Sequence, residues 1–271
     1  MTKKKKKSKK KSRSPALPKR GTRAAEDFFE SWGQINRFFH FVLGLVGHTD
    51  GVAEHAHNAL VETERDEAKK KKMIEEWGKR ITATQELKNN RQIFVEVIFV
   101  RHLENYLNYL SSLLYEIFTQ RPETLRSSDK IEISSVLQHD SVESIVRDIA
   151  ERKVEALSYS SFSDLTTFFK DRFNIKLVSD EELKKISDAI EIRNISVHNR
   201  CTINKRFVSR ANVSIDDIGK KKYLFSNDLD ELVPMLAKVV KSIDRSATSK
   251  LKLKGKIFAK KEKTRSGPDK S

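Results

Sequence analysis

The chain has 271 residues, enough for one large domain or two small ones, and its single cysteine, Cys201, excludes a disulfide within the chain. The formal net charge of +16 is concentrated at the two ends. Residues 1–23 hold twelve positive charges and no acid, and residues 250–271 carry a net +7, which leaves a slightly acidic body of net charge −3 between them.

Both basic tails, 1–23 and 250–271, are predicted to be disordered, because runs such as 3-KKKKKSKKKSR-13 repel themselves and cannot bury apolar surface. Three interpretations stay open: the tails bind RNA phosphates, they only keep the chain in solution, or a lysine run directs nuclear import. No apolar signal-peptide segment follows the basic N-terminus, and the longest apolar run, 38-FFHFVLGLV-46, is too short to span a bilayer. We therefore expect a soluble cytoplasmic protein without a membrane partner.

Residues 24–88 are predicted to form an N-terminal helical extension. A first helix is expected over 24–46, ended by Gly47 and the turn after it. A second, long and charged helix is expected over 52–88. Its middle part offers little apolar surface, so we expect an exposed arm there.

Residues 90–248 are predicted to form a helical bundle, which makes the fold class all-α. The clearest helix is 91–119, where apolar side chains recur alternately four and three residues apart: Phe99, Leu103, Tyr106, Leu110, Leu113 and Ile117. Further helices are expected over 141–158, 161–172, 180–198 (with Ser179 and Asp180 as caps) and 227–248. The segments 121–140 and 205–225 are expected to be irregular, and 222-KYLF-225 is also compatible with a short strand.

Several kinds of site are set aside. The chain has no Gly-rich phosphate loop, no His-Glu-x-x-His motif and no cysteine pair. His48, His55 and His57 with Asp50 suggest a metal site, but His55 and His57 would project about 200° apart on a helix. The sequence therefore predicts neither a metal nor a cofactor.

The stretch 191-EIRNISVHNR-200 combines polar and charged residues with a helix that is apolar on two sides. One face carries Leu183, Ile186, Ile190 and Val197, while Ile192 lies roughly opposite and Ile195 to one side. Such a helix is either central to a bundle or packed on a partner. Arg193 and His198 would project about 140° apart and lie about 7.5 Å apart along the axis.

One straight helix therefore cannot easily aim Arg193 and His198 at the same atom, whereas a two-fold homodimer can bring both to a shared seam. A purely structural interpretation is also open. In it, Arg193 pairs with Glu191 and a backbone carbonyl satisfies His198.

The stretch 193-RNISVH-198 resembles the Arg-x4–6-His motif of HEPN-domain ribonucleases, with Asn194 as the polar residue that follows the arginine. Upstream, 104-ENYL-107 and 121-RPETL-125 resemble an earlier helix of bacterial HEPN-like proteins, and the likeness covers roughly residues 90–245. The resemblance implies a dimeric helical bundle with metal-independent endoribonuclease activity. It also implies a role in a toxin or anti-phage defence system, with an antitoxin or defence partner.

The implied chemistry assigns a role to each residue type. His198 would act as general base or acid, Arg193 would bind the phosphate, and Asn194 would orient the histidine or hold a phosphate oxygen. Supporting roles are expected for Glu191, Asn199 and Glu104, the last of which can also simply neutralise Arg193. Three cations are expected to line the path of the RNA: Arg200, Lys205 and Arg206.

Two alternatives to the ribonuclease remain open. The first is a non-catalytic HEPN-like module, in which the same helix builds a dimer or partner interface while the tails bind nucleic acid. The second is a basic-tailed nucleic-acid scaffold unrelated to HEPN proteins.

Overall fold

A computed structural model of the chain describes residues 18–126, 132–211 and 213–258, and within them it confirms the all-α fold class. Two short 3₁₀ helices, η1 and η2, and a pair of two-residue strands accompany the α-helices. The elements are β1 Arg20–Gly21, α1 Arg23–Thr63, α2 Glu67–Gly78, α3 Ala83–Asn89, α4 Arg91–Gln120, η1 Pro122–Leu125, α5 Ile133–Val136, α6 Val142–Ser158, α7 Phe162–Phe173, α8 Asp180–Asn199, α9 Lys205–Arg210, η2 Ile215–Asp217, α10 Ser226–Leu251 and β2 Lys256–Ile257.

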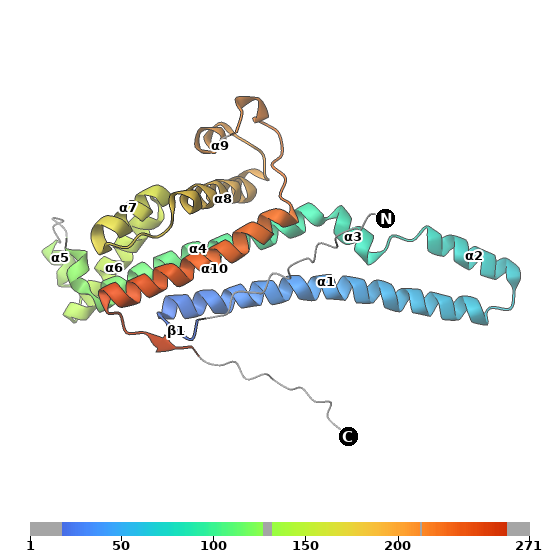
Figure 1. The fold of residues 1–271 in the computed structure, drawn as a ribbon, viewed down its shortest axis with the longest axis horizontal. Helices are drawn as coiled ribbons and strands as arrows, with labels where there is room; N and C mark the ends of the chain where they lie inside the picture. Colours follow the sequence, from blue (N-terminus) through green and yellow to red (C-terminus); the bar gives the residue numbers. More distant parts are fainter. Residues whose placement is uncertain (1–17, 127–131, 212, 259–271) are drawn as a thin grey trace, which may run out of the picture.

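Helix α4 is the centre of the bundle, with α1, α6 and α10 packed around it (Figure 1). The predicted apolar stripe of α4 is confirmed, because all six of its residues are at most 3% exposed: Phe99, Leu103, Tyr106, Leu110, Leu113 and Ile117. The core continues into α10 through Leu236, Val240 and Ile243. Helices spaced at the 3.6-residue period thus bury one continuous face.

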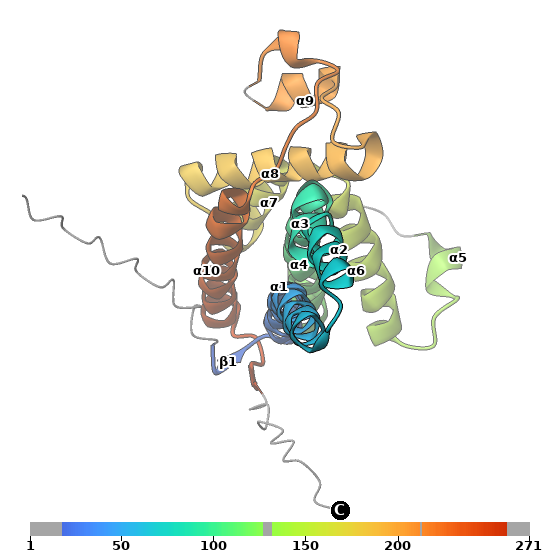
Figure 2. The same ribbon diagram turned by 90° about the vertical axis from the view of Figure 1, so that its right-hand side faces the viewer.

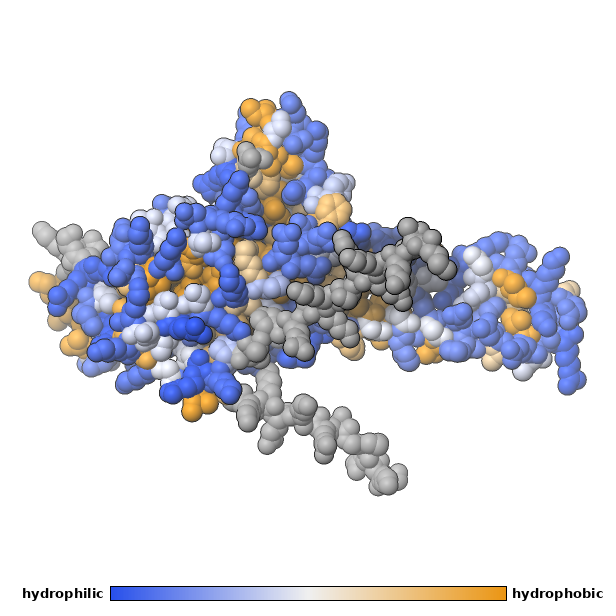
Figure 3. Space-filling model, viewed as in Figure 1, coloured by the Kyte–Doolittle hydropathy of each residue, from blue (hydrophilic) through white to orange (hydrophobic). Residues whose placement is uncertain are grey.

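Helix α8 crosses over α10 and α4 at one side of the bundle, and the segment that carries α9 projects above it (Figure 2). An ion pair between Glu182 Oε1 of α8 and Lys238 Nζ of α10, 3.2 Å long, ties the beginning of α8 to the bundle. Figure 3 shows apolar surface on the projecting segment, where Ile215 and Tyr223 are exposed.

The prediction that the first helix ends at Gly47 is wrong. Helix α1 runs through Gly44, Gly47 and Gly51 to Thr63 without a break. A glycine inside a helix costs roughly 0.5–1 kcal/mol but does not have to end it, and the only described glycine with positive φ is Gly219. The single helix expected over 52–88 is instead three pieces: the end of α1, then α2 and α3.

Beyond the bundle, the second half of α1 forms an arm with α2 and α3, which extends to the right in Figure 1. The expectation of an exposed arm is confirmed, since α2 and α3 contain no buried residue. The first half of α1 differs, because Ala25, Phe28 and Trp32 belong to the core. The boundary drawn between an extension at 24–88 and a bundle at 90–248 therefore divides one core.

The inner ends of both tails are ordered, contrary to the prediction for 1–23 and 250–271. Strands β1 and β2 pair antiparallel, and α10 extends to Leu251. Thr22 is fully buried, and it joins the N-terminal segment to α10 by a hydrogen bond. Charge repulsion along a run does not prevent its last residues from pairing across the fold. The outer parts of both predicted tails lie outside the described residues.

The expected irregular segments 121–140 and 205–225 contain only short helices within their described parts. Residues 222–225 form no strand, although an isolated bridge joins Thr202 to Lys221 just before them. None of the helices in the described ranges is long and apolar enough to cross a membrane.

Candidate functional site

Helix α8, which carries the candidate motif, begins and ends as the sequence predicts to within one residue. Ser179 and Glu182 form a capping box: the Ser179 hydroxyl accepts from Glu182 N at 3.3 Å, and Glu182 Oε2 accepts from Ser179 N at 2.9 Å. The helix ends at Asn199, after which Arg200 and Cys201 both adopt positive φ. The motif therefore occupies the last two turns of a well-defined helix.

Arg193 is held between Glu104, an expected partner, and Asn194, which was expected to serve His198 or the phosphate. Its Nη2 donates to Glu104 Oε1 of α4 at 3.2 Å, and its Nη1 donates to Asn194 Oδ1 at 3.2 Å. Glu104 also pairs with Arg101 at 3.4 Å. Arg193 Nε is buried without a hydrogen-bond partner among the described residues. The guanidinium thus has one orientation and an unused donor, and Asn194 orients the arginine rather than His198.

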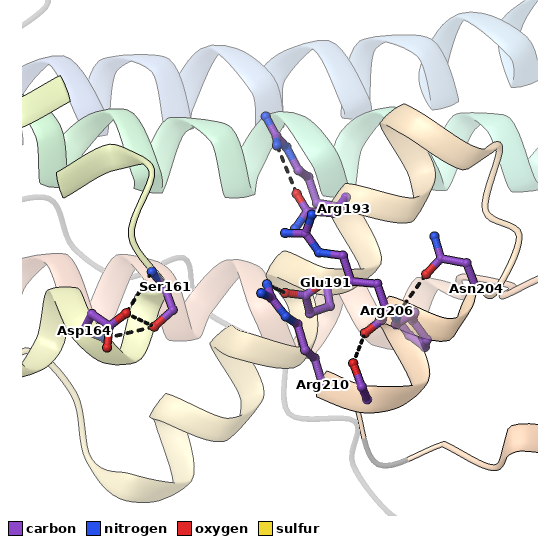
Figure 4. A network of polar contacts seen from close by, with 10 residues as sticks. Ser161, Asp164, Glu191, Arg193, Asn204, Arg206 and Arg210 are labelled. Carbon is purple, nitrogen blue, oxygen red and sulfur yellow. Dashed lines mark hydrogen bonds and ion pairs between the residues drawn. The ribbon is translucent and has the colours of Figure 1, made fainter. Parts of the chain in front are cut away.

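His198 lies apart from this cluster. Its side chain is exposed, and no described residue forms a hydrogen bond or ion pair with its imidazole. Arg193 extends toward α4 (Figure 4), while His198, five residues further along the same helix, is about 140° around its axis. The structure therefore brings Arg193, Asn194 and Glu104 together but not His198.

Glu191 does not support Arg193. It is 8% exposed, and its Oε1 accepts from Arg210 Nη1 of α9 at 3.0 Å. Figure 4 shows Glu191 and Arg193 projecting from α8 in different directions. The alternative pairing of Arg193 with Glu191 is therefore wrong. Residues two apart on a helix cannot share a face, and Glu191 instead fastens α9 to α8.

The second apolar side of α8 is covered by the chain itself. Ile195 is 3% exposed and packs in a small separate cluster with Ile203, Phe207 and Ala211. This side of α8 is therefore not available to a second copy of the chain, and it no longer supports a dimer. Sequence patterns within α8 could not show this, because the covering residues come from a segment expected to be irregular.

The remaining predicted residues follow the end of α8. Asn199 Nδ2 donates to the carbonyl of Thr202 at 2.6 Å and so closes the turn. Arg200, Lys205 and Arg206 are all exposed. Lys205 and Arg206 form the first turn of α9, whose Asn204 cap accepts from Phe207 N at 2.8 Å. Their exposure leaves the expected role in lining an RNA path a prediction.

An exposed apolar strip on α4 and α8, the two helices that carry the Arg193–Glu104 ion pair, was missed by the sequence patterns. Ile93 and Val97 precede Glu104 on one face of α4 at helical spacing and are 62% and 49% exposed. Val197, one turn after Arg193, is 50% exposed although the sequence placed it on the core side. Large apolar side chains exposed on both helices are available for contact with another molecule.

The turn after α8 lies against α4. Burial raises the pKa of the Cys201 thiol above its ordinary value, and the Glu96 carboxylate of α4 adds to the rise. The thiol also lies 3.2 Å from Ser196 Oγ. The chain from Arg193 to Cys201 therefore contacts α4 at Glu104 and at Glu96, and these contacts set the position of the motif on α4.

Two of the four residues that suggested a metal site, His57 and Asp50, have other partners. The His57 ring stacks on Trp77 of α2 at 4.2 Å between centroids. Asp50 accepts from the backbone N–H groups of Ala83 and Thr84 at 2.7 and 2.8 Å, and it pairs with Arg80. Hydrogen bonding from Thr84 holds the pKa of the Asp50 carboxyl below its ordinary value. Both residues hold the arm together.

Comparison with known proteins gives no relative: no family model, curated protein or solved structure matches this chain.

Proposed function

We propose that the protein is a metal-independent endoribonuclease of HEPN type whose active site is shared by two copies of the chain. The observation that carries the proposal is the placement of Arg193 and His198. The arginine is oriented by Glu104 and Asn194, while the histidine stands free in solvent on another side of the same helix. A phosphate bound by Arg193 would need a histidine from elsewhere, and a two-fold partner supplies one.

The strip of Ile93, Val97 and Val197 supports this assembly, since it exposes large apolar side chains on the helices that carry Glu104 and Arg193. Covering such side chains contributes roughly 25 cal/mol per Å² of buried apolar surface. The proposed dimer uses this strip, not the opposite side of α8, which α9 already covers.

In the proposed reaction, His198 accepts the proton of a ribose 2′-OH, and the oxygen attacks the adjacent phosphorus. The bond to the 5′-oxygen breaks, and that oxygen receives the proton back from the same histidine. The products are a 2′,3′-cyclic phosphate and a 5′-OH. The planar fork of Arg193 binds the non-bridging oxygens and the charge that develops on them. Arg200, Lys205 and Arg206 hold the flanking phosphates.

The first test is cleavage of a mixed RNA substrate by pure protein in EDTA. His198→Ala and Arg193→Lys should each reduce the rate about 100-fold or more, the second because an ammonium cannot replace a bidentate fork. His55→Ala, an exposed histidine on the arm, is the matched control and should cleave normally. DNA of the same sequence should remain intact. A rate that survives either motif variant, or that EDTA abolishes, contradicts the mechanism.

A mixing experiment tests the shared site. Arg193→Ala and His198→Ala proteins are each inactive, but a heterodimer contains one intact arginine and one intact histidine on different chains. Mixing the two should restore part of the activity. Light scattering at tens of micromolar should show a dimer, and Val97→Arg should dissociate it. A monomer that cleaves RNA would contradict the composite site.

The ion pair between Arg193 and Glu104 favours a second candidate, a non-catalytic interaction module in which Arg193 is structural. In that case Arg193→Ala would lower the melting temperature or change assembly, and the unsubstituted chain would not cleave RNA. A toxin or defence role, with an antitoxin or another system component as partner, comes from the family resemblance alone.

A further inference from the structure

The two ends of the body meet at one place. In the β1–β2 pair, Arg20 lies opposite Ile257 and Gly21 opposite Lys256, and Phe258 N donates to the carbonyl of Lys19 at 3.0 Å. The sequence before β1 and after β2 is strongly basic. Residues 1–17 hold nine positive charges, and residues 259–271 carry a net +3. Nothing in the sequence predicts that β1 and β2, the inner ends or roots of the two basic tails, lie side by side.

The junction is firmly built. Thr22 Oγ1 donates to Asp244 Oδ1 of α10 at 2.5 Å, and Asp244 is 5% exposed. Gly21 is required there, because a Cβ at that position would lie 2.4 Å from Asp244 Oδ2 and 2.8 Å from the Phe258 ring. The backbones of both tail roots are therefore held in one fixed position against α10.

A basic cavity lies at this junction. It encloses about 720 Å³, with Phe29 and Leu253 among its lining residues. Among its lining residues are the cations Lys19, Arg20 and Arg245 and the hydroxyl-bearing Ser249. Among the lining residues Asp244 is the single acid, and its carboxylate is bound by Thr22. Hydrophilic side chains dominate the surface around β1 in Figure 3.

We infer that this cavity and the two tail roots form one binding site for the phosphodiester backbone of single-stranded RNA. Cations from the N-terminal segment and from α10 converge on it, and each phosphate that they neutralise releases counterions. The site is hollow, which suits a flexible chain that can enter it and not a flat anionic membrane. The inference rests on the proposed function only in naming RNA as the polymer.

The test measures binding separately from cleavage. Full-length protein carrying His198→Ala is titrated with a fluorescent 12-nucleotide RNA across a series of salt concentrations. Arg245→Glu should weaken binding about fivefold more than Lys170→Glu and flatten the salt dependence by roughly 0.7 or more per lost phosphate contact. Lys170 is an exposed lysine on α7, so the control makes the same charge change away from the cavity.

Gly21→Val provides a variant without any charge change. If circular dichroism shows an intact fold, this variant should still weaken RNA binding, because the junction is displaced. Equal losses for Arg245→Glu and Lys170→Glu would overturn the inference, since total charge alone would then govern binding. The inference would also be overturned if Arg245→Glu weakened binding to phosphatidylserine vesicles but did not weaken binding to RNA. Normal binding of RNA without any cleavage by the unsubstituted chain contradicts only the proposed function.

Discussion

The two halves of α1 have the same backbone and opposite environments. In the bundle, Phe28 is 2% exposed and packs against Tyr109 with ring centroids 5.8 Å apart. Thirty-two residues later, in the arm, Leu60 is 60% exposed. Helix α1 passes between these regions without interruption (Figure 1). The comparison shows that the helix continues where burial in the core ends, so we expect the stability of this protein to be concentrated in the body.

Replacing one large apolar residue in each half of α1 tests this contrast directly. Phe28→Ala removes a buried ring and leaves a cavity, so the free energy of unfolding should fall by about 3–5 kcal/mol. Leu60→Ala should change it by less than about 0.5 kcal/mol. Urea titrations of the two variants provide the measurement. A large cost for Leu60→Ala would show that the outer face of the arm is packed against something in solution.

A buried histidine, His102, should make the stability of the body depend on pH, whereas the exposed histidines of the arm should not. Burial lowers the pKa of His102 from 6.5 to about 4. Between these values the unfolded chain binds more protons than the folded one, so stability should fall as the pH drops from 7.5 to 4.5, by ~2.5 kcal/mol from this residue.

His102→Leu should remove that part of the acid loss, as measured by urea titration at both pH values. His55→Leu changes an exposed histidine on the arm and should leave the loss in place. Burial also raises the pKa of Asp244 and Glu116, which acts in the opposite direction. The difference between variant and parent isolates His102. Identical pH dependence of the His102 variant and the parent would disprove the assignment.

The smallest expected effect concerns the arm alone. Asp50→Ala removes the acceptor of the first N–H groups of α3, so the amides of Ala83 and Thr84 should exchange with solvent faster. The melting temperature of the body should stay unchanged. Hydrogen exchange read by mass spectrometry would detect this, with Glu86→Ala in the same helix as the control. A lower melting temperature would mean that arm and body unfold together.

The sequence identified many residues of the candidate site but not the contacts that these residues make. The motif 193–198, the capping Ser179 and the matching Glu104 were all identified from pattern and resemblance. Their partners were not: Glu191 pairs with Arg210, and Asn194 binds Arg193. A pattern along one helix fixes the direction in which each side chain leaves it. The element that lies in that direction depends on how distant segments pack.

By itself the sequence determined the all-α class and the bounds of α4, α6, α7, α8 and α10 to within a few residues, because the spacing of apolar side chains is local. Only the tertiary structure decided that α9 covers Ile195 and that Thr22 reaches Asp244. Such contacts join separate elements of the chain, so no local pattern predicts them. Helix α1 continues through Gly47 although nothing packs on that glycine, because a glycine costs a helix only about 1 kcal/mol.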